Sequence, residues 1–354
     1  MLRGHFIVKG VAILSLLFSF YYVTSQRAFE NFLDTLNITF DDFPQEYAKV
    51  LNESVANKQQ PPEDFDYEST FKHIQIPRII HYIWFKDLYP TREGATKIPS
   101  VGSQSPELCR KFNPNYEIRM WNATSARDLL AAEYSWFLPT YDNYRYPIQQ
   151  IDALKYFALY HYGGVYMDLD IACRRNLDPL LDFPAWFPEA SPLGVNNDLM
   201  AAAPRHPVLK RMTERLSAYN RNWIFPYITI FWTTGPHFTT DILHEWYSSS
   251  DRPGVVDGSK KKEAGPNVFW VLPRIFYSEE YTFFGHSPGG TWHGADVATV
   301  LWFVDHPAIT IGILLLLCAA ITALLYRKLR SNRASYTAVP ARDRSSSEGT
   351  RAWD

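Results

Sequence analysis

The spacing of hydrophobic and polar residues changes abruptly in the middle of the chain, between Ile148 and Ile171. Up to Tyr162, apolar and aromatic residues recur at helical spacing, which predicts an amphipathic helix. Gly163 and Gly164 come next, and glycine tolerates the left-handed cap and the sharp turn that end such a helix. The pattern then alternates and predicts a strand. One face of this strand is formed by Val165, Met167, Leu169 and Ile171, and the other by Tyr166, Asp168 and Asp170.

The two carboxylates at the end of this strand indicate a cation site. A folded chain places two acids side by side only where positive charge neutralises them. Oxygen ligands suit Mg²⁺ or Mn²⁺, and such an ion commonly holds a diphosphate. Asp152 and Lys155 are three residues apart on the preceding helix, so they share a face that borders the glycine corner. A solvated strand end is the alternative for Asp168-Leu169-Asp170 alone, because D-x-D is common by chance.

Further strands and helices are predicted around this stretch. Residues 78–85 are β-branched and aromatic, which is typical of a strand. Residues 113–121 predict a turn that leads into a second strand, and residues 125–133 predict a helix. Strands that alternate with helices favour a parallel sheet with right-handed crossovers, and such sheets bind ligands beyond the carboxyl ends of their strands. We therefore expect an α/β catalytic domain over residues 76–300, with the acid pair at its binding edge.

Two later segments carry polar residues that suit a site. Asn197 and Asp198 precede a strand of small residues, where an ordinary turn and a place in the site account for them equally well. The segment 284–294 is rich in glycine and contains His286, Trp292 and His293. Both histidines are candidate metal ligands, and His293 is favoured because it follows Trp292. Two surface-loop histidines are the alternative.

Two apolar segments near the chain ends predict membrane helices. Residues 6–25 and 307–326 are apolar and long enough to span a bilayer, and basic residues flank both. The basic flanks predict that residues 1–5 and a disordered tail, 327–354, are cytoplasmic and that everything between the helices is lumenal, with residues 26–75 as a polar stem. A cleaved signal peptide is the alternative for the first segment.

Composition and cysteine content add few constraints. The formal charge of −2 gives no reason to expect nucleic acid as a partner. Cys109 and Cys173 could pair if the domain is lumenal, a question that the sequence leaves open, whereas Cys318 lies in an apolar segment and is expected to be a free thiol. Three N-x-[ST] sequons agree with a lumenal domain, at Asn37, Asn52 and Asn122.

The central stretch resembles a known enzyme family. The order Asp152, Lys155, Gly163-Gly164, Tyr166, Asp168 and Asp170 is similar to the DXD region of glycosyltransferase family 32. The resemblance implies a Rossmann-like GT-A domain in which the helix acid and base hold the donor sugar and the D-x-D holds the metal and the nucleotide. The usual base in that pattern is arginine. Lys155 keeps the charge but not the bidentate geometry.

The same resemblance implies roles for other residues. Ile83 and Trp84 would pack on the guanine of the nucleotide, and Asn197 and Asp198 would face the sugar. The C-terminal loop with Trp292 would close over the diphosphate, and one of its residues would complete the metal shell. The resemblance also implies retention of the anomeric configuration. Asp198 as a nucleophile and front-face attack assisted by the leaving phosphate both fit.

Two membrane helices around such a domain are similar to the inositol phosphoceramide mannosyltransferase catalytic subunits. That similarity implies GDP-mannose as donor, inositol phosphoceramide as acceptor, Mn²⁺ or Mg²⁺ as cofactor and a small membrane regulatory subunit as partner. It also implies a Golgi membrane location with the catalytic domain in the lumen. An α-mannosyltransferase that acts on protein-linked glycans is one alternative, and a non-catalytic membrane adaptor with a degenerate sugar-nucleotide fold is another.

Overall fold

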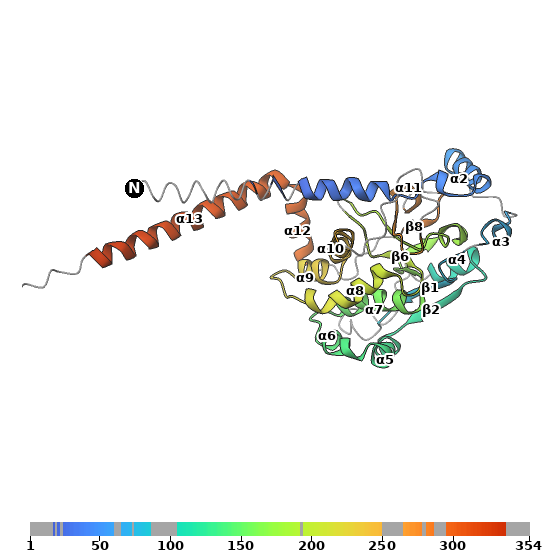
Figure 1. The fold of residues 1–354 in the computed structure, drawn as a ribbon, viewed down its shortest axis with the longest axis horizontal. Coiled ribbons are helices and arrows are strands. Elements are labelled where there is room, and N and C mark those ends of the chain that lie inside the picture. Colours follow the sequence, from blue (N-terminus) through green and yellow to red (C-terminus); the bar gives the residue numbers. More distant parts are fainter. Residues whose placement is uncertain are drawn as a thin grey trace, which may run out of the picture. The chain divides into compact units, whose positions relative to one another are not determined.

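The computed structural model describes residues 17, 20–21, 24–59, 65–72, 74–85, 105–191, 194–249, 265–277, 281–286 and 295–337. The chain divides into two compact units. The larger unit is Ser25–Val297, and the smaller combines Met1–Thr24 with Ala298–Asp354. The larger unit contains the sheets and the helices around them (Figure 1).

A six-stranded sheet forms the middle of the larger unit, in the order β2-β1-β3-β6-β5-β7. β1 pairs in parallel with β2 and β3, and β5 pairs in parallel with β7, whereas β6 is antiparallel to both β3 and β5. The strand predicted at 78–85 and the strand predicted after the turn in 113–121 are therefore confirmed, but the expected parallel sheet is in fact mixed because β6 runs the other way. The strand bounds are β1 (Ile79–Ile83), β2 (Glu117–Trp121), β3 (Gly164–Met167), β5 (Ala185–Pro188), β6 (Leu199–Ala202) and β7 (Trp270–Leu272).

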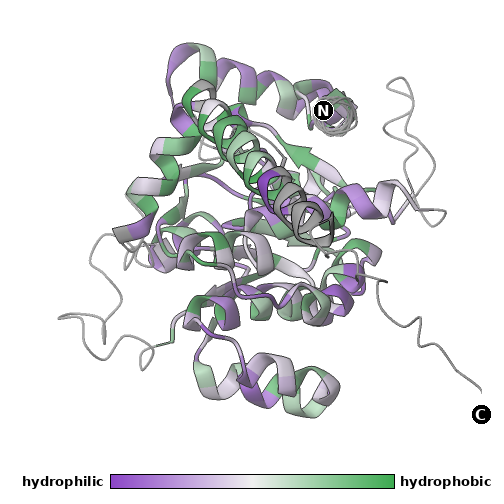
Figure 2. Cartoon of the chain, turned by 90° about the vertical axis from the view of Figure 1, so that its left-hand side faces the viewer, coloured by the Kyte–Doolittle hydropathy of each residue, from purple (hydrophilic) through white to green (hydrophobic). Residues whose placement is uncertain are grey.

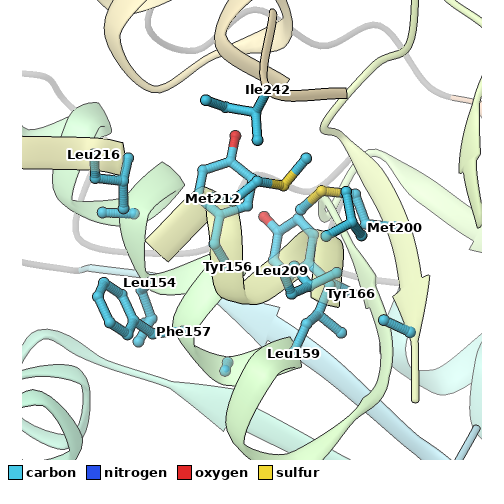
Figure 3. Close-up of a cluster of buried hydrophobic side chains, with 14 of the residues drawn as sticks. Leu154, Tyr156, Phe157, Leu159, Tyr166, Met200, Leu209, Met212, Leu216 and Ile242 are labelled. Carbon is cyan, nitrogen blue, oxygen red and sulfur yellow. The ribbon is translucent and has the colours of Figure 1, made fainter. Parts of the chain in front are cut away.

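Helices cover both faces of this sheet, because successive side chains of a strand point to opposite sides and both sides are apolar here. Tyr166 and Met200 belong to one buried cluster with α5 (Ala123–Glu133), α7 (Pro147–Tyr162), α8 (Pro207–Tyr219) and α10 (Pro236–Tyr247). Figure 3 shows side chains of α7, α8 and α10 meeting Tyr166 and Met200. Val165 and Met167 belong to a second cluster with α2 (Gln45–Asn57) and α4 (Ser105–Phe112).

Several further helices of the larger unit are short. They are α3 (Tyr67–Thr70), α6 (Leu138–Asp142), α9 (Pro226–Thr233), α11 (Arg274–Tyr277) and the 3-10 helices η1 (Phe40–Asp42), η3 (Ser135–Phe137) and η4 (Asp178–Leu180).

The strand that was expected to carry the acid pair ends before it. β3 stops at Met167, and the next residues form a turn in which Ile171 N donates to Asp168 O over 3.0 Å. The chain then continues as β4 (Ile171–Cys173), which pairs antiparallel with β8 (Phe284–His286) in a separate two-stranded sheet. The predicted alternation holds as far as β3 extends, but Asp168 and Asp170 lie on a turn between two sheets.

The glycine corner adopts backbone conformations that side chains disfavour. Gly163 has φ +66° and ψ −164°, so it has the expected positive φ but not the left-handed helical ψ. Gly164 has φ +103°, and an added Cβ would lie 2.6 Å from Ile79 O. His81 is fully buried beside this corner and donates from Nε2 to Gly163 O over 2.8 Å. Its Nδ1 accepts from Trp121 Nε1 over 3.1 Å, so the imidazole ties β1 to β2 and to the corner.

A disulfide fixes the chain that follows the acid pair. Cys109 on α4 is bonded to Cys173 at the end of β4, which answers the pairing question that the sequence leaves open. The bond closes a loop with a sequence separation of 64 residues. In the chain-entropy model a loop of this length stabilises the folded state by about 4 kcal/mol.

The segment expected to be a lumenal stem is part of the folded unit. Residues 24–35 are helical, and Phe29 and Leu33 are buried in the first cluster. Ile38 N donates to Val271 O over 2.9 Å, and Val271 N donates to Leu36 O over 3.0 Å. The polar composition of residues 26–75 led to the stem prediction, but apolar residues of this segment such as Phe29, Ile38 and Phe43 belong to the two buried clusters.

The smaller unit is dominated by α13 (Pro307–Thr337), which α12 (Ala295–Asp305) precedes. Green residues predominate on the long helix that points toward the viewer in Figure 2. Among the described residues, no single helix meets the length and hydropathy expected of a membrane span. One bent pair, Asp296–Asp305 with Ile309–Leu325, meets them together at an angle of 97°. The predicted membrane helices therefore stay predictions, and residues 6–25 lie largely outside the described residues. The expected tail from residue 327 begins as helix, because α13 continues to Thr337.

Candidate functional site

The candidate residues meet at one edge of the sheet because of the strand directions. Five strands are parallel to one another, so their carboxyl ends share an edge, and the antiparallel β6 begins there. Trp84 follows β1, Asp168 follows β3, and Asn197 and Asp198 precede β6. Tyr277 ends α11, which follows β7. A backbone hydrogen bond from Asp168 N to Asp198 O, 2.7 Å long, joins two of these segments directly.

Lys155 is the central cation of the site. Its Nζ lies 3.0 Å from Asp152 Oδ1 and 3.2 Å from Asp168 Oδ1, and it donates to Asn197 O over 3.3 Å. The ammonium also lies 4.8 Å from the ring centroid of Tyr166, where the electron-rich face attracts it. Burial opposes the charge of Lys155, but the two carboxylates outweigh burial and raise its pKa. Lys155 is therefore charged, and it links the helix acid to the D-x-D turn as the sequence predicts.

Asp152 is held rigidly by neutral donors. Its Oδ2 accepts from Thr234 Oγ1 over 3.0 Å, and its Oδ1 accepts from Asn197 Nδ2 over 3.3 Å. The Asn197 amide also donates to Tyr156 OH over 3.1 Å and to Thr234 O over 3.3 Å. The side chain of Asn197, predicted to face the sugar, is thus buried among protein partners and orients Asp152.

Asp198 is half-buried beside the D-x-D turn. Its Oδ2 accepts from Asn196 Nδ2 over 2.7 Å and from the Tyr277 hydroxyl, whereas its buried Oδ1 has no hydrogen-bond partner among the described residues. Burial, and secondly the negative charge of Asp168, raise the pKa of Asp198 to about 7. A carboxyl in this state is close to half protonated at neutral pH.

The D-x-D turn is more open than the rest of the site. Asp168 and Asp170 are half-buried, and Asp168 Oδ1 accepts from the Tyr166 hydroxyl. Burial and the neighbouring Asp168 raise the pKa of Asp170 to about 6. Lys155 alone cannot neutralise the four acids at this edge, which are Asp152, Asp168, Asp170 and Asp198.

The charge and ligand types of this edge fit a divalent cation. No group of three His, Cys, Asp or Glu side chains in the described ranges is arranged to hold a metal by itself. Mg²⁺ is usually bound by one or two carboxylates together with substrate phosphates rather than by an all-protein cage. The carboxylates of Asp168 and Asp170, of which only Asp168 is paired with Lys155 among the described residues, match that mode, in which a diphosphate supplies further oxygen atoms.

The other predicted site residues occupy varied positions. The Ile83 side chain is packed in the first cluster, so only its backbone is available to a nucleotide. Trp84 is half-buried, and its Nε1 is a buried donor without an acceptor among the described residues. His286 donates from Nε2 to Tyr277 O over 2.9 Å, which leaves Nδ1 as its free nitrogen for a metal. Trp292 and His293 lie outside the described residues.

Four residues of the site were missed by the sequence reasoning. Thr234 and Tyr156 hold Asp152 and Asn197, and Tyr277 and Asn196 hold Asp198. Thr234 stands in a Thr-Thr-Gly-Pro run that reads as an ordinary helix start, and Tyr277 stands in an aromatic turn. No local signal marks either residue, because each reaches the site only through the sheet topology.

Comparisons with known proteins agree with this geometry. Residues 99–186 match a family described as a glycosyltransferase sugar-binding region containing a DXD motif. Inositol phosphoceramide mannosyltransferase 3 of Schizosaccharomyces pombe is 36% identical over 66% of this chain and 60% of its own length. Mannosyl phosphorylinositol ceramide synthase SUR1 of Saccharomyces cerevisiae is 36% identical over 69% of this chain and 59% of its own. The chain thus spans about 60% of these two relatives.

A third relative is matched over most of both chains. Inositol phosphoceramide mannosyltransferase 2 of Schizosaccharomyces pombe is 31% identical over 80% of this chain and 79% of its own. A solved structure of the PaToxG glycosyltransferase matches 57% of this chain and 77% of that chain, with 16% identity and a TM-score of 0.38, which is too weak a likeness to assign the fold. The match to the third relative and the DXD region together establish that this chain belongs to the inositol phosphoceramide mannosyltransferase family.

Proposed function

We propose that this protein is a metal-dependent, retaining mannosyltransferase with a GT-A domain, which transfers mannose from GDP-mannose to inositol phosphoceramide. The observation that carries the proposal is the placement of Lys155 between Asp152 and Asp168 at the edge where the strands end. The names of the relatives supply the sugar and the acceptor. The fixed acids and the fixed base supply the means of holding a sugar nucleotide.

The residues of the chain divide the work by their positions. Asp152 and Lys155 are buried and oriented by Thr234 and Asn197, so they are suited to fix sugar hydroxyls without rearrangement. The buried indole N–H of Trp84, at the end of β1, is suited to donate to the nucleotide base. Asp168 and Asp170 would hold Mn²⁺ or Mg²⁺, and the bound ion would act as a Lewis acid that neutralises the departing diphosphate.

The surroundings of Asp198 bear on how configuration is retained. A carboxylate nucleophile needs an exposed oxygen, but Oδ1 of Asp198 is buried and Oδ2 is engaged by Asn196 and Tyr277. These contacts favour front-face attack, with Asp198 supporting the turn that carries Asp168.

The lipid acceptor accounts for the expected membrane context. We infer that the chain is held in the Golgi membrane by segments 6–25 and 307–326, with its catalytic unit in the lumen and a small membrane regulatory subunit as partner. The disulfide between Cys109 and Cys173 supports an oxidising compartment such as the secretory lumen.

The proposal is tested with Asp170→Ala and with the double variant Asp168→Ala, Asp170→Ala. The full chain is expressed in membranes and supplied with GDP-mannose, inositol phosphoceramide and Mn²⁺, and mannosylated lipid is measured. We expect both variants to lose transfer while membrane yield persists. Asp128→Ala, an exposed acid on α5, is the matched control and should retain activity. Undiminished transfer by the double variant would refute the site, and transfer only to protein-linked glycans would favour the other mannosyltransferase.

A further inference from the structure

The larger unit exposes a compact group of aromatic and aliphatic side chains far from the acid pair in sequence. We name it the Trp223 patch. It consists of Trp223, Ile224, Phe225, Tyr227, Phe231 and Trp232. Ile224 is 93% exposed, and Trp223, Phe225 and Trp232 are each about 40% exposed. Exposed apolar residues are ordinary when scattered, but a contiguous group usually marks an interaction surface.

Hydrogen bonds and ring contacts within the protein hold the patch in place. Trp223 N donates to Thr229 Oγ1 over 2.9 Å, and that buried hydroxyl also contacts Trp223 O at 3.3 Å. The rings of Trp223 and Trp232 meet edge to face at 5.0 Å, and those of Tyr227 and Phe231 stack at 5.8 Å. These contacts fix Trp223 and Tyr227 on either side of the exposed Ile224.

The chemistry of the patch and its link to the chain identify the occupant. Residues 219–227 contain no acidic side chain and one exposed cation, Arg221. Tryptophan, tyrosine and arginine beside aliphatic tips are typical of the membrane–water interface. Tyr227 N donates to Asp296 Oδ2 over 2.8 Å, and Asp296 begins the bent apolar helix pair. A hydrogen bond therefore links the patch to Asp296, the first residue of the apolar helix pair.

We propose that the Trp223 patch inserts into the interfacial layer of a lipid bilayer and docks the catalytic unit on the membrane surface. Docking of this kind brings the sheet edge to a lipid acceptor that cannot leave the bilayer, and in this respect it deepens the proposed function. The insertion itself does not require transfer activity. Arg221 would add attraction to anionic lipid.

The test uses the full chain in vesicles of phosphatidylcholine and phosphatidylserine that contain no other protein. In a Cys318→Ser background, which removes the free thiol, Ile224→Cys is labelled with a polarity-sensitive fluorophore. Met120→Cys is the matched control, because Met120 is 42% exposed on β2. β2 lies on the other side of the larger unit from α9 (Figure 1). We expect a blue shift and quenching by spin-labelled lipid at position 224 but not at position 120.

Equal emission and quenching at the two positions would overturn the proposal. That result would favour a protein partner as the occupant of the Trp223 patch, since these vesicles contain no other protein. Kinetics give a second reading. Ile224→Asp should raise the KM for acceptor in vesicles about tenfold, the loss expected for one buried aliphatic side chain, and leave kcat unchanged. Met120→Asp should change neither. If no variant or wild type transfers mannose, the proposed function fails, but the quenching result still decides the docking.

Discussion

The ammonium of Lys155 lies 3.2 Å from the carboxylate of Asp168, so a helix side chain reaches across the glycine corner to the D-x-D turn. Both Lys155 and its other partner, Asp152, are almost fully buried. Removing the cation leaves a buried carboxylate without compensation, and such losses cost about 3–5 kcal/mol.

We therefore expect Lys155→Met to lower the free energy of unfolding by about 3 kcal/mol and to abolish transfer. Lys155→Arg should lose less stability, because it keeps the charge although its larger head must be accommodated. Denaturant unfolding of the purified chain in detergent measures both variants. Equal stability of Lys155→Met and wild type would show that Asp152 and Asp168 do not depend on this ammonium.

The carboxyl of Asp198, one of whose oxygens is buried, predicts a pH dependence of stability. Its pKa is about 7 in the folded protein, against about 3.9 in an unfolded chain. Between these values the folded state binds a proton that the unfolded state has released. Metal-free protein should consequently lose stability as the pH rises from about 4 to about 7, by on the order of 1.4 kcal/mol per pH unit.

Asp198→Asn removes the titrating group and should flatten this part of the profile, whereas Asp128→Asn on the surface should not. Thermal unfolding in the presence of a chelator, scanned across that pH range, makes the comparison. A profile for Asp198→Asn as steep as that of wild type would assign the slope to other groups.

The acid pair Asp168 and Asp170, which Lys155 neutralises only in part, predicts stabilisation by metal. Mn²⁺ at 100 times its dissociation constant should stabilise wild type by about 2.7 kcal/mol and leave Asp170→Ala unaffected. Because the pKa of Asp170 is about 6, protons should compete with the metal below that pH. Unfolding midpoints with and without Mn²⁺, measured in buffers of pH 7.5 and pH 5.5, show both effects. An equal shift of the unfolding midpoint in Asp170→Ala would show that the metal binds elsewhere.

The glycine corner predicts a large difference between two equivalent substitutions. Gly164→Ala puts a Cβ 2.6 Å from Ile79 O at φ +103°, so it should cost about 2–3 kcal/mol. Gly265→Ala meets no atom within 4 Å and should be close to neutral. Unfolding of the two variants side by side isolates the corner from the general effect of adding a methyl group.

Local patterns predicted the helix before the corner, the positive φ of Gly163 and the partnership of Asp152, Lys155 and Asp168, because these depend on spacing along the chain. The reversed direction of β6 could not be read in this way. A strand of small residues such as Leu199–Ala202 carries no sign of its direction, which is set by the path of the chain between sheet positions.

The supporting residues were unpredictable for a related reason. Thr234 is 82 residues from Asp152 in sequence and meets it only because the start of α10 packs against α7. The burial of Asn197 was equally hidden, since an asparagine in a turn is expected to be solvated. Hydrogen-bond partners of this separation follow from tertiary packing and not from composition.

The hydrogen bonds between residues 36–38 and Val271 set a limit on trimming the protein for secretion. A shortened form that starts at residue 76 would uncover the outer edge of β7, and bare strand edges recruit other chains and aggregate. It would also lose the contact between the rings of Phe29 and His244, whose centroids lie 4.7 Å apart. A soluble version that stays monomeric should therefore begin upstream of Phe29.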